Sequence, residues 1–189
     1  LRELASAAPD LHLSTPVRPA ALRSPRAGCS IEACIVLAVE RPQQPLKPLL
    51  DLEEYLAGCG LEHKLLHLIK MRASQINGCA YCLDMHSLDA RAAGETEQRL
   101  YTLDAWAETP FFTDRERAAL AWTEAVTLVS ETHVPDDVYE ETKKHFSEQE
   151  LVDLTLAVGM INMWNRLAIS TRSVPGRYKP AQTATASGS

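Results

Sequence analysis

Two cysteines and a histidine lie close together near the middle of the chain, in the stretch INGCAYCLDMH. Cys79 and Cys82 are three residues apart, and His86 follows four residues after Cys82. Residues four apart on a helix share one face, so the His86 imidazole could take the Cys82 proton or, as a cation, lower the pKa of that thiol. Two thiols at this spacing can also close a disulfide. The motif thus offers a nucleophile, a second thiol and a base.

The residues alone leave three interpretations of this motif open. It could be a redox-active pair, a zinc site in which His63 or His67 supplies a fourth ligand, or an ordinary part of a helical core. The dipeptide Asn77-Gly78 is a strong helix break, which predicts that a new helix begins at Cys79. The amino-terminal end of a helix stabilises a thiolate. This placement favours the redox interpretation.

The pattern around the motif predicts an all-α fold of five or six helices. Apolar residues recur at helical spacing, and no segment alternates as a strand does. Thr113 with Glu116, and Ser147 with Glu150, have the spacing of capping boxes at the start of two helices. The helix after Ser147 is apolar around most of its circumference, so we expect it to be buried on several sides, in part by another subunit.

Composition limits the organisation and the partners of the protein. The 189 residues suffice for one domain, which we expect at 48–178, between a proline-containing and largely disordered tail at 1–47 and a disordered tail at 179–189. The net charge of −6, without a dense basic cluster, argues against nucleic-acid binding. No apolar run is long enough to span a membrane.

The remaining cysteines indicate a reducing compartment. Five cysteines are too few, and odd in number, for a secreted disulfide framework, so we expect a cytoplasmic protein. Cys29, Cys34 and Cys59 have no partner at a useful spacing and are interpreted as incidental.

Several polar and aromatic residues of the helices are interpreted as structural. Asn165 and Arg166 lie in the apolar last helix, where we expect them to form buried hydrogen bonds. Trp106, Trp122 and Trp164 are expected to anchor the core or an interface.

The motif and its surroundings also resemble a known family. RASQINGCAYCLDMH, followed by ARAAGE, FTDRERAALAWTEAVT and INMWNRLAI, closely resembles the AhpD-like alkylhydroperoxidase group of the carboxymuconolactone decarboxylase superfamily, over about residues 49–172. The resemblance implies an all-α fold assembled as a homotrimer or homohexamer. It also implies reduction of a hydroperoxide with electrons from a dithiol protein, a reaction for which we expect no cofactor and no metal ion.

The resemblance assigns a role to each residue of the motif. Cys82 would attack the peroxide, Cys79 would resolve the sulfenic acid into a disulfide, and His86 would belong to the proton relay. Family members with a full relay have a glutamate twelve residues before the first cysteine, where this chain has His67. A histidine can relay a proton, but it lacks the fixed negative charge of a carboxylate.

Two other functions compete with peroxide reduction. A lactone decarboxylase of the same superfamily would need no redox cysteines, and this chain keeps the complete set of two cysteines and a histidine. A non-catalytic, zinc-stabilised binding module is the second alternative. Stoichiometric zinc that is lost together with the cysteines would identify it.

Overall fold

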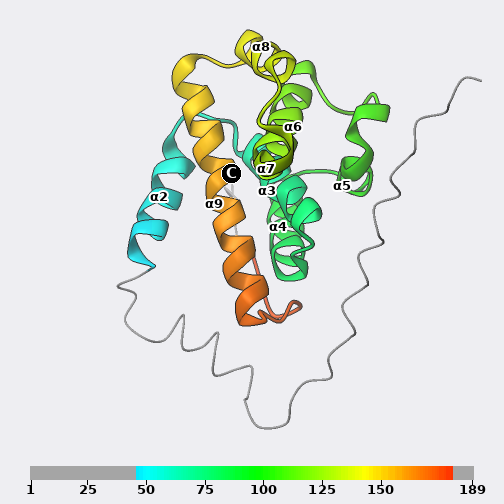
Figure 1. Ribbon diagram of the computed structural model, residues 1–189. Coiled ribbons are helices and arrows are strands. Elements are labelled where there is room, and N and C mark those ends of the chain that lie inside the picture. Colours follow the sequence, from blue (N-terminus) through cyan, green and yellow to red (C-terminus); the bar gives the residue numbers. More distant parts are fainter. Residues whose placement is uncertain (1–45, 181–189) are drawn as a thin grey trace, which may run out of the picture.

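The computed structural model describes residues 46–180, and this part of the chain is helical with no strands (Figure 1). The all-α prediction is confirmed, whereas the expected number of five or six helices is too low, because the described residues form eight α-helices and one 3-10 helix. These are α2 Lys47–Gly58, α3 His63–Asn77, α4 Ala80–Ala92, α5 Glu97–Thr102, η1 Leu103–Glu108, α6 Asp114–Thr127, α7 Val129–Thr132, α8 Asp136–His145 and α9 Glu148–Thr171.

The additional elements are short and arise where the backbone leaves helical geometry. The helical segment around Leu100 divides into α5 and the 3-10 helix η1, inside which Ala105 has φ −112°. The single turn α7 follows Leu128, whose φ of −100° and ψ of 33° end α6. Apolar spacing continues through both places, so the hydrophobic pattern does not reveal the breaks.

The core lies where α3, α6 and α9 pack against one another, with α2 and α4 also in contact with α9 (Figure 1). Leu68 and Ile69 of α3 and Leu154 of α9 have no exposed surface, and a side chain buried in this way contributes about 1.5–3 kcal/mol. The prediction that the last helix is buried holds for one side of α9. Its opposite side exposes Val152 and Met163.

Both predicted capping boxes are present. The hydroxyls of Thr113 and Ser147 accept the backbone N–H groups of Glu116 and Glu150, and each glutamate accepts the backbone N–H of its cap residue. Such caps stabilise a helix by about 1 kcal/mol each. They fix the starts of α6 and α9, the helices that pack on α3.

The tails predicted at 1–47 and 179–189 lie almost wholly outside the described residues, as do Cys29 and Cys34. Within residues 46–180, none of the helices has the length and apolar character needed to cross a membrane.

Candidate active site

A left-handed turn at Gly78 places Cys79 at the start of α4. Gly78 has φ 65° and ψ 35°, a conformation that glycine adopts readily and other residues rarely do. The backbone N–H of Gly78 donates to the carbonyl of Gln75, and that of Cys79 donates to the carbonyl of Ser74. This turn ends α3 and begins α4 within two residues, as the Asn77-Gly78 dipeptide predicts.

A buried hydrogen-bond network fixes this turn to α9. The Nδ2 atom of Asn77 donates to the Oδ1 atoms of Asn162 and Asn165, both at 2.9 Å, and Asn165 Nδ2 donates to Ser74 Oγ at 3.0 Å. Asn165 is fully buried, as predicted, but the same prediction is wrong for Arg166. Arg166 is exposed and donates only to the carbonyl and Oδ1 of Asn162 on its own helix. The network therefore rests on asparagine side chains.

The two motif cysteines lie together in the first turn of α4 and form a disulfide. Their Cα atoms are 5.4 Å apart, and Cys79 caps the helix because its Sγ accepts the backbone N–H of Cys82 at 3.4 Å. Each cysteine is only 1% exposed, and the pair packs with Ala73 and Ile161. The two cysteines are thus brought together as their spacing predicts.

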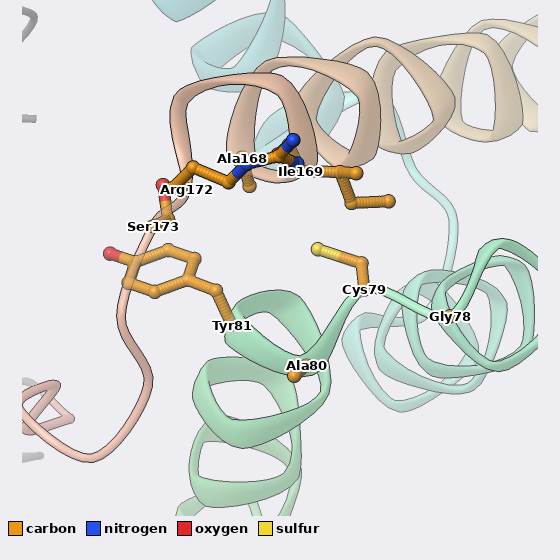
Figure 2. A pocket seen from close by; sticks show the side chains of 8 residues that line it. All are labelled: Gly78, Cys79, Ala80, Tyr81, Ala168, Ile169, Arg172 and Ser173. Carbon is orange, nitrogen blue, oxygen red and sulfur yellow. The ribbon is translucent and has the colours of Figure 1, made fainter. Parts of the chain in front are cut away.

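A pocket of about 310 Å³ opens beside this disulfide on the side of Cys79. Its walls come from the start of α4 and from the end of α9, two segments about 90 residues apart in the sequence (Figure 2). The lining residues are Gly78, Cys79, Ala80, Tyr81, Ala168, Ile169, Arg172 and Ser173. Cys79 lines this pocket and Cys82 does not.

His86 lies on α4 four residues after Cys82 and is buried, with 7% of its surface exposed. Burial lowers the pKa of His86 to about 3, and the charges of Lys70 and His67 add to this effect. The ring is therefore neutral at pH 7. In this disulfide form of the site, burial disfavours a positive charge on His86, and both roles considered for it, proton acceptor and positively charged neighbour of a thiolate, stay predictions.

His67 is half-buried on α3, and its charge acts on His86. Burial lowers the pKa of His67, and Asp89 of α4 partly opposes this shift. The Nδ1 atom of His67 is buried and makes no hydrogen bond with any described residue. The structure thus places both predicted relay histidines in one region, on adjacent helices. His63, in contrast, is exposed.

Lys70 is a site residue that the sequence analysis did not single out. Its Nζ forms an ion pair with Glu53 of α2 at 2.7 Å, and Glu53 also accepts the indole N–H of Trp164 at 3.0 Å. The only signal in the sequence was the position of Lys70 three residues after His67, on the same side of α3. Its partner Glu53 could not be identified without the fold.

The segment after α9 crosses back over α4. The backbone N–H of Gly176 donates to Asp84 at 2.7 Å, and the hydroxyl of Tyr178 donates to Asp89 at 2.7 Å. Burial and the Asp89 carboxylate raise the pKa of Tyr178 to about 12. The carboxylate that acts on His67 is therefore held by this segment.

The remaining predictions concern metal ligands and tryptophans. Among residues 46–180, no three His, Cys, Asp or Glu side chains are grouped so that they could hold a metal ion. Cys59 is a free, half-buried thiol. Trp122 is buried in the core, and Trp106 and Trp164 pack partly buried against it, so all three act as core anchors.

Comparison with known proteins identifies the family. The carboxymuconolactone decarboxylase family matches residues 46–125. The uncharacterized protein YdfG of Bacillus subtilis is 45% identical over 125 residues, which cover 66% of this chain and 85% of YdfG. The chain belongs to the carboxymuconolactone decarboxylase family.

Two solved structures have the same fold as this family member. A protein of unknown function from Agrobacterium tumefaciens, named as a candidate antioxidant defence protein AhpD, is 45% identical with a TM-score of 0.71. The match covers 75% of this chain and 96% of that protein. The debrominase Bmp8 is 19% identical with a TM-score of 0.65, covering 76% of this chain and 77% of Bmp8, and shows the fold alone. The resemblance to the AhpD-like group is confirmed.

Proposed function

We propose that the protein is a thiol-dependent peroxidase that reduces hydroperoxides through Cys79 and Cys82. Cys82 attacks the distal oxygen of the hydroperoxide, the O–O bond breaks, and an alcohol leaves with the proton that His86 has taken from the thiol. Cys79 then attacks the sulfenic sulfur of Cys82 and expels water, forming the disulfide. A dithiol protein returns the pair to two thiols.

The disulfide at the start of α4 is the observation that carries this proposal. Cys79 and Cys82 pair within one helical turn, so oxidation and resolution need no large movement of the chain. The ring of His86 is unprotonated at neutral pH and so has a free nitrogen for the thiol proton, although burial makes it a weak base with a pKa of about 3. His67 stands as a second relay member on the neighbouring helix, in place of the family glutamate.

Stopped-flow measurement of peroxide consumption by the reduced protein tests the proposal. We expect Cys82→Ser to lose the fast phase, and Cys79→Ser to consume one equivalent of peroxide and stop, because its sulfenic acid cannot be resolved. Cys59→Ser is the matched control, since Cys59 is a free thiol outside the pair, and it should retain the wild-type rate. Equal rates in the wild type and Cys82→Ser would end the proposal.

We also propose that the protein works in the cytoplasm as a homotrimer or homohexamer. Support comes from the exposed large apolar side chains on α9, Val152, Leu156 and Met163, which a second copy would cover. Light scattering after size exclusion would give the mass. A monomer at all protein concentrations would refute this part of the proposal.

A lactone decarboxylase is the second candidate, because the family that matches the chain is named for that activity. Neutral buried histidines could move a proton in such a reaction without any help from sulfur. Decarboxylation of carboxymuconolactone by the Cys79→Ser/Cys82→Ser protein would establish this function, and its absence in the wild type would exclude it. Elemental analysis of the same preparations tests the zinc-stabilised binding module. Stoichiometric zinc in the wild type that is lost with the cysteines would support it, and its absence would exclude it.

A further inference from the structure

The pocket beside the disulfide has one charged side chain, and that charge is positive. Arg172 follows the end of α9 with φ 62°, and its Nη1 donates to the carbonyl of Ile169 at 2.9 Å. Among the described residues, no carboxylate forms an ion pair with Arg172, and none of the eight lining residues is acidic. Its side chain lies along the end of α9, beside Ala168 and Ile169, on the opposite side of the pocket from the start of α4 (Figure 2). The pocket therefore favours an anionic ligand.

The disulfide presents its two sulfurs unequally to this pocket. Cys79 lines the pocket and its sulfur points toward the end of α9 (Figure 2), whereas Cys82 lies one turn further into the helix and does not line it. In thiol–disulfide exchange the incoming thiolate bonds to one sulfur and the other leaves with the electron pair. Because Cys82 lies in the first turn of α4, the helix end stabilises it as the leaving thiolate.

We propose that this pocket binds a negatively charged thiol reductant, that Arg172 pairs with its acidic group, and that its sulfur attacks Cys79 and not Cys82. This inference rests on the proposed function, because it concerns the step that returns the disulfide to thiols. The first thiolate of the reductant bonds to Cys79 and releases Cys82 as a thiolate. The second thiol of the reductant attacks the reductant sulfur of the mixed disulfide and releases Cys79. The reductant leaves as a disulfide, and its two protons pass to the cysteines.

The attacked sulfur can be located with monothiol probes, which stop at the mixed disulfide. The oxidised full-length protein is mixed briefly with 2-mercaptoethanesulfonate, quenched in acid and alkylated, and peptide mass spectrometry then finds the probe and the alkyl group. We expect the probe on Cys79 and the alkyl group on Cys82. The probe on Cys82, or equally on both cysteines, would overturn the assignment.

The role of Arg172 is tested by comparing two probes that differ in charge. The rate with 2-mercaptoethanesulfonate is divided by the rate with neutral 2-mercaptoethanol, each normalised to its thiolate concentration. We expect Arg172→Gln to lower this ratio by up to about fivefold, the upper limit for a pair with an exposed charge, and 1 M salt to lower the wild-type ratio similarly. Arg91→Gln, an exposed arginine of α4 outside the pocket, should leave the ratio unchanged. An unchanged ratio in Arg172→Gln would refute the anionic ligand.

Two further measurements separate this inference from the proposed function. If Arg172→Gln slows oxidation by peroxide and leaves reduction unchanged, the pocket serves the hydroperoxide and the inference is wrong, although the peroxidase stands. If the wild type consumes no peroxide but the probe still bonds to Cys79 with the expected charge preference, the peroxidase fails and the assignment of the exchange step stands.

Discussion

The buried neutral ring of His86 makes a quantitative prediction about stability in acid. The fold lowers the pKa of His86 from 6.5 to about 3, so the unfolded chain binds a proton at pH 5 that the folded chain does not. The corresponding stability is fully present above pH 6.5 and is lost as the pH falls from 6.5 toward 3. Since pH 5 lies about 1.5 units below the pKa of the histidine in the unfolded chain, the free energy of unfolding is lower there by ~2 kcal/mol.

Urea unfolding of the oxidised protein, followed by circular dichroism at pH 7 and pH 5, measures this loss. Protein concentration is held constant because assembly would shift the apparent stability. We expect the free energy of unfolding to decrease from pH 7 to pH 5 by ~2 kcal/mol less in His86→Gln than in the wild type. His63→Gln, which removes an exposed histidine of α3, should keep the full wild-type decrease.

The same decrease in His86→Gln and the wild type would refute the reasoning. A second readout does not depend on unfolding: the Cε1 proton of His86 should show no titration by NMR between pH 5 and pH 8. A midpoint near 6.5 would mean that the ring is solvated and that its role as a neutral proton acceptor is lost.

Three further predictions concern the elements that position the site, each measured by urea unfolding at pH 7. Gly78→Ala should lower the free energy of unfolding by about 1–2 kcal/mol because φ is 65° there, although a Cβ would meet no atom within 4 Å. Gly159 lies in the regular part of α9 with equal space, so Gly159→Ala should raise the free energy of unfolding by about 0.5–1 kcal/mol. Opposite signs would contradict the backbone argument. Asn165→Leu should cost roughly 2–4 kcal/mol because its buried partners lose their hydrogen bonds, and a loss below 1 kcal/mol would show that the network is dispensable. Ser147→Ala should cost about 1 kcal/mol, and no loss would mean that the cap of α9 does not contribute.

The sequence predicted those parts of the site that depend on local spacing. The pairing of Cys79 with Cys82 and the break at Gly78 follow from residues within one turn of each other. The burial of His86 could not be predicted in this way. Its surroundings include Lys70 of the preceding helix, and only the fold brings that charge near the ring. A histidine with an ordinary pKa and one with a pKa of about 3 have the same sequence signature.

The pocket illustrates the same distinction over a longer separation. Arg172 and Cys79 are 93 residues apart in the sequence, and they line the same pocket. The hydrogen bond between Asn77 and Asn165 holds the turn between α3 and α4 against α9. In sequence, Asn165 is a polar residue in an apolar helix, which indicates a buried partner but does not say which residue it is. The partner is Asn77, the residue directly before Gly78 and the turn that places the cysteines.

Under the proposed function, the charges around the cysteines would give the two half-reactions different surroundings. On the side of α3, burial lowers the pKa of both His86 and His67, and Lys70, whose charge acts on both rings, forms an ion pair with Glu53. Such surroundings can accept a proton but do not attract an anion from solvent. On the outer side, Arg172 faces the pocket at the sulfur of Cys79 (Figure 2). A neutral hydroperoxide needs the proton acceptor, whereas an anionic thiol needs the cation. The proposed mechanism would therefore bring the two reactants to different faces of one disulfide.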